Sequence, residues 1–248
     1  MVDLARTMRA LAGMEAVRPL APAVIVSVVF AALARLVRGV TVGGAIAGAG
    51  ICCLLYVGAG LGAFLVLVSV FALTWLSTRF GYRRKEKLGT AERSDGRTAL
   101  QVLANLTVSA GCAGLSIVTA RKEMFLLAVS AALSEAAADT VSSEVGQARS
   151  ADARLIVNWE VVPAGTDGGV SWAGTAAGVA AAALVSLVSV MTGLIPLKWV
   201  GVSIAAAVSG MIADSFLGAL LEQRKVLNND AVNFLGTLVA ACVAALVA

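Results

Sequence analysis

The chain has 248 residues, of which 59% are hydrophobic and 14% charged, and its formal net charge is +4. A soluble domain carries about 25% charged residues, so the composition excludes an ordinary soluble enzyme and indicates a protein that folds in lipid. The lack of histidine excludes Ser-His-Asp triads and histidine-bound metals. Basic residues lie between apolar stretches rather than on a basic face with aromatics, so no nucleic-acid partner is expected. We expect residues 1–248 to form one integral membrane domain.

Eight apolar segments follow one another, each near the roughly 20 residues that a spanning helix needs. The second and third meet at Gly58-Ala59-Gly60, which predicts a tight turn between antiparallel helices. The fifth segment is short and ends in polar residues, which predicts a tilted helix or a helix end in a polar cavity. The fold class is therefore all-α, a polytopic membrane helix bundle. The segments cover residues 20–37, 40–57, 60–78, 99–119, 123–138, 172–194, 197–221 and 231–248.

The Lys and Arg residues are distributed unevenly between the two sides of this bundle. Eight spans place both termini on one side, and most of the basic residues fall on the other, which predicts that this other side is cytoplasmic. Loops 78–98, 139–171 and 222–230 would then be cytoplasmic and both termini would face away. The basic side holds Arg35, Arg38, Arg79, Arg83, Arg84, Lys85, Lys87, Arg93, Arg97, Arg149, Arg154, Arg224 and Lys225; the other holds Arg6, Arg9, Arg18, Arg121, Lys122 and Lys198.

Two parts of the chain resemble each other. Residues 134–140 and 209–215 both fit S-x-x-x-A-D-[ST], and residues 170–175 resemble residues 232–237 at the start of the following span. This pattern predicts two copies of one helix–loop–helix unit, and membrane proteins often place their sites where repeats meet. Chance similarity among Ala- and Gly-rich helices is the alternative.

Acidic residues inside apolar helices are costly, so by default they indicate function. Asp139 and Asp214 lie at or within the ends of apolar segments. Glu135 lies one helical turn before Asp139, and Glu144 lies five residues after it. Such carboxylates could bind Mg²⁺ together with a phosphate substrate. Solvation of a helix end, or a structural ion pair, is the alternative. The four cysteines lie in apolar runs without metal-ligand spacing and are predicted to be packing residues.

The segment Pro163–Ser171 reads P-A-G-T-D-G-G-V-S and opens a helix. Its glycines would let backbone N–H groups approach an anion at a helix N-terminus. Asp167 would repel a phosphate, but it could hold the Mg²⁺ that binds one. The simpler interpretation is a glycine-rich turn capped by Asp167 or Ser171.

A polar stripe enters the fourth apolar segment. Arg97, Gln101 and Asn105 are spaced by four residues, so they share one helix face and should point to the interior or to a cavity. Asn229 and Asn233 could do the same on the last helix. Interhelical hydrogen bonding is the alternative. The basic loop 78–98 could bind anionic headgroups or a phosphorylated ligand, or could simply mark the topology.

Four motifs together resemble the membrane family that includes phytyl-phosphate kinase of plant vitamin E metabolism and transmembrane protein nineteen of animals. The chain carries them in the order typical of that family, over about residues 75–240. They are K-E-K-L-G from Lys85 with Gly96-Arg97 and Q-V-L-A-N from Gln101; A-D-T from Ala138 with E-V-G from Glu144; P-A-G-T-D-G-G-V-S from Pro163; and D-S-F-L-G-A from Asp214 with Asn229 and Asn233.

The resemblance implies a kinase that converts a prenyl monophosphate, such as phytyl, farnesyl or geranylgeranyl phosphate, to the diphosphate. The donor would be a nucleoside triphosphate such as CTP, used with Mg²⁺. Catalysis is assigned to Asp139, Asp167 and Asp214, and metal binding to these three together with Glu144. Phosphate and nucleotide binding is assigned to Lys85, Lys87, Arg97, Gln101, Asn105, Thr140, Gly165, Thr166, Gly168, Gly169, Ser171, Ser215, Asn229 and Asn233.

Two other functions fit the residues. A transporter of a phosphorylated or lipid-like solute would also have repeats and intramembrane acids, although it needs its acids at the midplane. A lipid-binding scaffold without turnover is the third possibility. Small-residue spacings such as Gly44 and Gly48 are typical of helix packing within a chain or between copies, so a homo-oligomer is also open.

Overall fold

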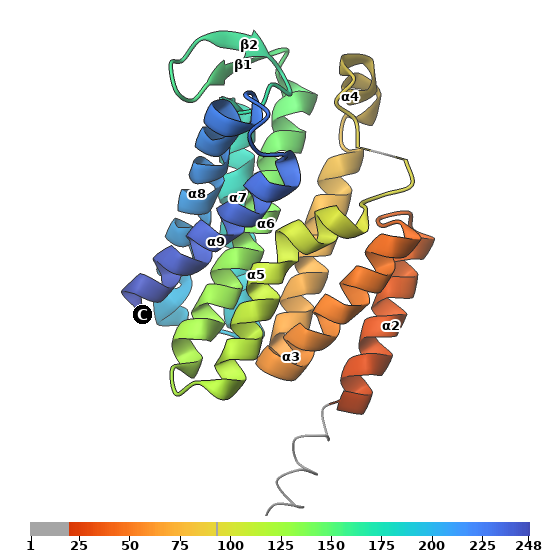
Figure 1. Cartoon of the computed structure of the whole chain (residues 1–248), viewed down its shortest axis with the longest axis vertical. Helices are drawn as coiled ribbons and strands as arrows, with labels where there is room; N and C mark the ends of the chain where they lie inside the picture. Colours follow the sequence, from red (N-terminus) through yellow and green to blue (C-terminus); the bar gives the residue numbers. More distant parts are fainter. Residues whose placement is uncertain (1–19, 93) are drawn as a thin grey trace, which may run out of the picture.

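The computed structural model describes residues 20–92 and 94–248, which form a helix bundle with a small β-sheet at one end (Figure 1). Among these residues, six helices are long and apolar enough to cross a membrane. The predicted polytopic helical membrane fold is therefore confirmed. The elements are α2 (Leu20–Leu36), α3 (Val42–Arg79), α4 (Tyr82–Leu88), α5 (Ala99–Val118), α6 (Lys122–Arg149), β1 (Asp152–Leu155), β2 (Val161–Pro163), β3 (Gly169–Val170), α7 (Trp172–Met191), the 3-10 turn η1 (Leu197–Trp199), α8 (Val200–Leu217), the π-helical turn η2 (Gly218–Glu222) and α9 (Asn229–Val247).

Helix α3 doubles back on itself at Gly60. That glycine has φ 79° and ψ −174°, a conformation that other residues rarely adopt. Both ends of α3 lie at the same end of the bundle, since the side chains of Trp75 (3.2 Å) and Arg79 (2.8 Å) donate hydrogen bonds to the carbonyl of Val37, just before α3 begins. The turn predicted from Gly58-Ala59-Gly60 is present, and the two arms of α3 are the second and third predicted spans.

Helix α6 is longer than its apolar segment suggested. The prediction that 139–171 is a loop is wrong for residues 139–149, because α6 continues to Arg149. No glycine or proline interrupts the chain before Gly146, and α6 is buried over most of its length by the helices around it. The rest of the predicted loop folds into a sheet of order β2-β1-β3 with antiparallel pairs, a small addition to the all-α class.

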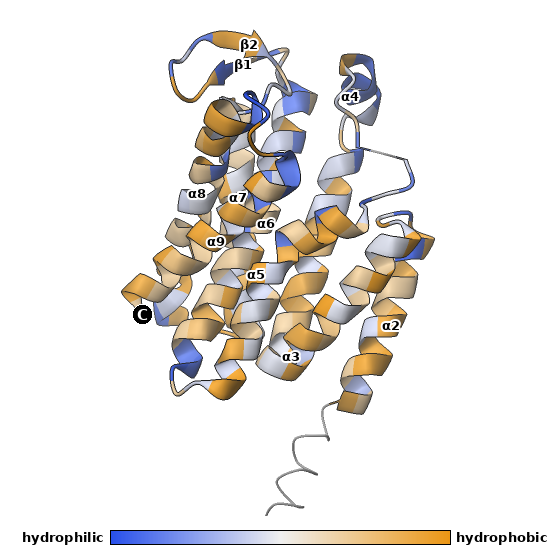
Figure 2. Cartoon of the chain, viewed as in Figure 1, coloured by the Kyte–Doolittle hydropathy of each residue, from blue (hydrophilic) through white to orange (hydrophobic). Residues whose placement is uncertain are grey.

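The polar segments gather at one end of the bundle. Helix α4, the sheet and the turn before α9 lie at the end opposite the C-terminus (Figure 1), and hydrophilic residues concentrate there (Figure 2). This arrangement agrees with the predicted grouping of the three polar loops. Which side of the membrane this end faces stays a prediction. Four of the counted basic residues lie outside the described residues: Arg6, Arg9, Arg18 and Arg93. The predicted position of the N-terminus lies outside them as well.

Small residues bring α6, α7 and α8 close together. A Cβ atom at Gly178 of α7 would lie 2.9 Å from the carbonyl oxygen of Ala138 and 2.5 Å from the sulfur of Met211. One turn earlier, a Cβ at Gly174 would lie 2.6 Å from the carbonyl of Ser142. These positions admit only glycine at the present helix spacing, so the packing of this region depends on them.

Four buried serines link the same three helices through their hydroxyl groups. Ser203 of α8 lies 2.9 Å from Ser130 of α6 and 2.9 Å from Ser186 of α7. Ser186 in turn lies 3.1 Å from Ser134 of α6. Each of these fully buried hydroxyls lies within hydrogen-bond distance of another, which is how polar groups stabilise helix contacts in lipid.

Candidate functional site

A polar cavity of about 290 Å³ lies where α6, η2 and the start of α9 meet the glycine-rich loop. Most of the predicted site residues line it, although they come from separate parts of the chain. Asn233, one turn beyond Asn229, is half-buried and lies outside the cavity lining. The predicted residues that do line it are Asp139, Glu144, Gly165, Thr166, Asp167, Gly168, Gly169, Ser171, Asp214, Ser215 and Asn229.

Two acids from the two predicted repeat units meet in this cavity. The carboxyl groups of Asp139 on α6 and Asp214 on α8 lie against each other, and Arg97 is the cationic neighbour of Asp139. Asp139 is ten residues before the end of α6 rather than at a helix end, because α6 continues to Arg149. The site therefore sits at the interface between the two helical hairpins α6–α7 and α8–α9.

A third acid is buried beside this pair. Glu135 is 1% exposed, and within the described residues neither its Oε1 nor the Oδ2 of Asp214 has a hydrogen-bond partner. Glycine makes room for both: a Cβ at Gly236 of α9 would lie 2.6 Å from Glu135 Oε1 and 3.4 Å from Asp214 Oδ2. Buried carboxyl oxygens without partners are costly and are characteristic of sites that bind a ligand.

The glycine-rich loop is held in place over η2. Gly165 and Gly168 have φ of 89° and 73°, which favours glycine at both positions. A Cβ at Gly168 would lie 2.4–2.7 Å from atoms of Ala219, and the Gln223 side chain donates a 2.7 Å hydrogen bond to the carbonyl of Asp167. The loop is thus fixed against the helix that carries Asp214.

The end of this loop starts α7 in the expected way. Ser171 is the N-cap, and its hydroxyl accepts a 3.2 Å hydrogen bond from the N–H of Gly174. The simpler interpretation of the motif, a capped glycine-rich turn, is therefore correct for Ser171. Anion binding by Gly165, Thr166, Gly168 and Gly169 stays a prediction.

The carboxylates in this cavity suit a metal ion whose remaining ligands come from the substrate and from water. Among the described residues, no group of three or more Asp, Glu or Cys side chains is arranged to hold a metal ion. Mg²⁺ in phosphate-transfer sites needs only one or two carboxylates, since substrate phosphates and water supply the rest. Burial raises the pKa of Asp167 above its ordinary value, and a bound cation would reverse that shift. Asp139 and Asp214 lie against each other, so this pair matches the one or two carboxylates that such a metal needs.

Lys85 has a structural position. Its ammonium group forms a buried ion pair with Glu144 and also donates to the carbonyls of Ser77 (3.2 Å) and Thr78 (2.7 Å). An ammonium group has three N–H donors, so these partners use all of them. Lys85 therefore fastens α4 to α6. Lys87 is exposed on α4 and does not line this cavity. The phosphate-binding roles of both lysines stay predictions.

The backbone around Arg97 is locked to the linker between α2 and α3. Gly96 has φ 89°, and a Cβ there would lie 2.5 Å from backbone atoms of Gly39. The N–H of Arg97 donates to the Gly39 carbonyl (3.1 Å), and its own carbonyl accepts from the N–H of Thr41 (2.9 Å). The Arg97 guanidinium then donates a 3.1 Å hydrogen bond to the hydroxyl of Thr140, next to Asp139. The Gly-Arg pair of the first motif thus has a physical explanation.

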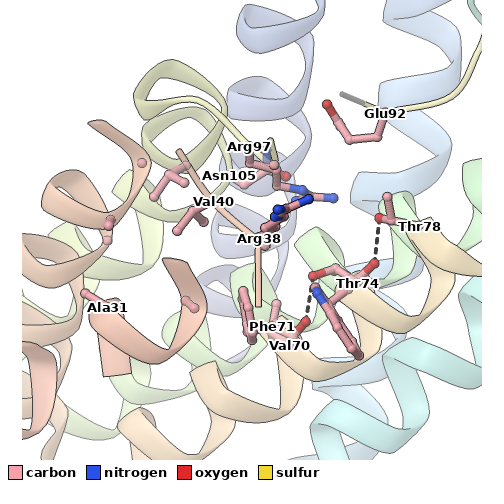
Figure 3. A pocket seen from close by; sticks show the side chains of 18 of the residues that line it. Ala31, Arg38, Val40, Val70, Phe71, Thr74, Thr78, Glu92, Arg97 and Asn105 are labelled. Atoms are coloured by element: carbon pink, nitrogen blue, oxygen red, sulfur yellow. Dashed lines mark hydrogen bonds between the residues drawn. The ribbon is translucent and has the colours of Figure 1, made fainter. Parts of the chain in front are cut away.

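Sequence reasoning missed a second cavity, of about 490 Å³, between α2, α3 and α5. Its walls are largely apolar, with Phe30, Val70 and Phe71 among them, and the side chains of Arg38 and Arg97 lie close together in it (Figure 3). The first three spans were notable only for being apolar, so composition gave no sign of a cavity. Arg38, directly after an apolar span and before a glycine, is the one weak signal.

The predicted polar stripe is only partly directed at this cavity. Arg97 and Asn105 line it, as expected. Gln101 instead completes the capping box of α5, where its side chain accepts from the N–H of Thr98 (2.7 Å) and donates to Glu92 (3.3 Å). Glu92 lines both cavities, so the apolar and polar cavities adjoin near Arg97.

Comparison with known sequences agrees with the resemblance. Residues 25–241 match the family described as integral membrane protein DUF92. The chain belongs to this family. An uncharacterized membrane protein of Methanocaldococcus jannaschii is 34% identical over 188 residues, which are 76% of this chain and 77% of that protein.

Two further relatives come from photosynthetic organisms. The chloroplastic protein VTE6 of Arabidopsis thaliana is 31% identical over 193 residues, which are 73% of this chain but only 58% of the plant protein. An uncharacterized membrane protein of Synechocystis is 31% identical over 189 residues, 75% of this chain and 73% of that protein. No solved structure matches the chain.

Proposed function

We propose that this protein is a prenyl-monophosphate kinase that works where the two cavities adjoin. The observation that carries the proposal is Arg97, whose guanidinium lines the apolar cavity while it bonds Thr140 beside Asp139 in the polar one. An apolar cavity with two cationic side chains close together suits a prenyl phosphate. A polar cavity with carboxylates and a glycine-rich loop suits a nucleoside triphosphate. The similarity to the plant protein VTE6 supports the prenyl phosphate assignment.

The chemistry needs positioning and charge more than acid–base groups. An oxygen of the prenyl monophosphate forms a bond to the γ-phosphorus of the donor as the bond to the leaving nucleoside diphosphate breaks. The attacking oxygen is already anionic, so no general base must remove a proton, which suits a chain without histidine. Arg97 lies where it would orient the acceptor phosphate and offset the charge that develops during transfer.

Mg²⁺ belongs to this proposal as the partner of the donor. Asp139 and Asp214 would hold it, with Asp167 on the loop above, and when bound it would neutralise charge on the donor phosphates. The loop Pro163–Ser171 would lie along those phosphates, and CTP is our proposed donor.

The test is a transfer assay on purified protein in detergent with Mg²⁺. Farnesyl, geranylgeranyl and phytyl phosphates are each combined with CTP, ATP, UTP and GTP, and prenyl diphosphate is detected by mass. We expect diphosphate from at least one pair, with product absent when Mg²⁺ is chelated. A folded protein that gives no product with any pair, and that moves a prenyl phosphate across proteoliposomes without nucleotide, would replace the kinase by a transporter.

A further inference from the structure

The apolar cavity is lined by charged as well as hydrocarbon side chains. Arg38, two residues after α2, and Arg97, two residues before α5, lie close together in the cavity (Figure 3). Phe30 lines the cavity from within α2, eight residues before Arg38. Leu67 lines it from the second arm of α3, twelve residues before Arg79. The lining thus combines charged side chains, Arg38, Arg97 and Glu92 among them, with a hydrocarbon part.

Such a lining matches a ligand with one anionic head and one hydrocarbon tail. A volume of about 490 Å³ lies within the usual range for small-molecule cavities, about 300–1,000 Å³. Lipid tails are as apolar as leucine, so a tail gains little from apolarity alone when it leaves the bilayer for this cavity. Shape and close packing must provide the selectivity.

One position in the cavity wall lets the chain set that shape. A Cβ at Gly48 of α3 would meet only Val102 Cγ1, at 3.9 Å, so a larger side chain would extend into the cavity. Gly44, one turn earlier, also lines the cavity, but a Cβ there would lie 2.4 Å from the Arg97 carbonyl and would disturb the helix contact. Gly44 is therefore needed for packing, whereas Gly48 leaves space.

We propose that the cavity between α2, α3 and α5 holds the isoprenoid tail of the acceptor, with Gly48 determining the chain length that fits and Arg38 binding the phosphate together with Arg97. This inference rests on the proposed kinase function, because it is that function's acceptor that occupies the cavity. Most of this cavity is lined by α2 and α3, which the four sequence motifs do not cover. Gly48 is the residue that would select the substrate by its chain length.

The experiment measures binding without nucleotide, so it does not depend on turnover. Equilibrium binding of radiolabelled geranylgeranyl phosphate and of the shorter geranyl phosphate is compared for the wild type and two variants in detergent. Gly48→Leu should lower the affinity for geranylgeranyl phosphate by about tenfold or more and the affinity for geranyl phosphate much less. Gly50→Leu is the matched control: it is the same change two residues later, at an exposed position with nothing within 4 Å of a Cβ. It should bind both ligands like the wild type.

A second pair of variants tests the head. Arg38→Gln should weaken the binding of geranylgeranyl phosphate and leave the binding of geranylgeraniol, which has no phosphate, unchanged. Arg35→Gln, on the same helix and outside the cavity lining, should change neither. Equal losses for the phosphate and the alcohol in Arg38→Gln would show that Arg38 does not bind the head.

The outcomes separate this inference from the kinase proposal. If Gly48→Leu melts well below the wild type, Gly48→Ala replaces it, because its single methyl group makes only an ordinary contact; it should shift the preference toward geranyl phosphate. If Gly48→Leu selectively loses binding of geranylgeranyl phosphate, and the wild type gives no transfer, the cavity assignment would be retained and the kinase rejected. Transfer in the wild type, with Gly48→Leu and Gly50→Leu equally able to bind both chain lengths, would reject the cavity and retain the kinase.

Discussion

The hairpins α6–α7 and α8–α9 pack closely through glycines and serines and leave a polar cavity of about 290 Å³ at one end, whereas α2, α3 and α5 enclose a largely apolar cavity of about 490 Å³. The first region carries the half-buried acids Asp139 and Asp214, and the second supplies Arg97. Close packing fixes charged groups that would otherwise be solvated or move apart. A cavity, by contrast, needs walls that tolerate a ligand of variable shape. The difference indicates that one half of the bundle positions charge and the other accommodates a tail.

The largest expected effect is at the connection between the two regions. Lys85→Met leaves the Glu144 carboxylate buried without its cation, which typically costs about 3–5 kcal/mol. The measurement is the free energy of unfolding in mild detergent. The double variant Lys85→Met with Glu144→Gln should recover part of the loss. If Lys85→Met were as stable as the wild type but lost prenyl phosphate binding, Lys85 would bind phosphate as the motif resemblance predicted.

The next effect tests the tightly packed region as the source of positioned charge. Asp139→Asn and Asp214→Asn should each lower the transfer rate by about 100- to 1,000-fold, the usual cost of removing one electrostatic contributor from a transition state. Steady-state assays of diphosphate formation measure it. Glu123→Gln, the same chemical change at the exposed opposite end of α6, should leave the rate unchanged. Full activity in both aspartate variants would contradict the assignment of the site.

A smaller effect concerns how well each region accommodates a larger side chain. Gly178→Leu forces a side chain against Ala138 and Met211 and should cost about 1–3 kcal/mol, seen as a lower melting temperature. Gly111→Leu on α5 is the control, because a Cβ there has no neighbour within 4 Å and the position is exposed. Equal melting temperatures for the two variants would mean that the close packing of α7 is not required.

The smallest effect concerns the serine chain. Ser186→Ala removes the hydroxyl that lies between Ser134 and Ser203, and hydrogen bonds between membrane helices are worth about 0.6 kcal/mol on average. Ser209→Ala, which removes a bond to the carbonyl of its own helix, should change the unfolding free energy less. A loss of transfer activity without a loss of stability in Ser186→Ala would point to a functional role for the chain instead.

The sequence was informative wherever chemistry is costly in lipid. Asp139 and Asp214 were identifiable because acids are rare in apolar helices, and the structure brings them together. Hydropathy predicted the spans, but it placed the end of α6 too early, since residues 139–149 are mostly polar and resemble a loop in composition. The Lys85 side chain pairs with Glu144, 59 residues away, which the sequence could not show. The Gln101 side chain completes a capping box with Thr98, a local pattern that the sequence analysis did not use. The apolar cavity could not be predicted, because an apolar side chain beside a cavity and one in a filled core look identical in sequence.

The reversal at Gly60 decides from which side of the membrane each later helix starts. If residues 42–79 formed one uninterrupted helix, every later segment would enter the bilayer from the other side, and Asp139 and Asp214 would be presented to the opposite compartment. A single φ of 79° at a residue without a side chain therefore fixes the side of the membrane toward which the polar ends of the later helices point. A substitution at Gly60 that removed the turn would change the side of the membrane to which Asp139 and Asp214 are presented.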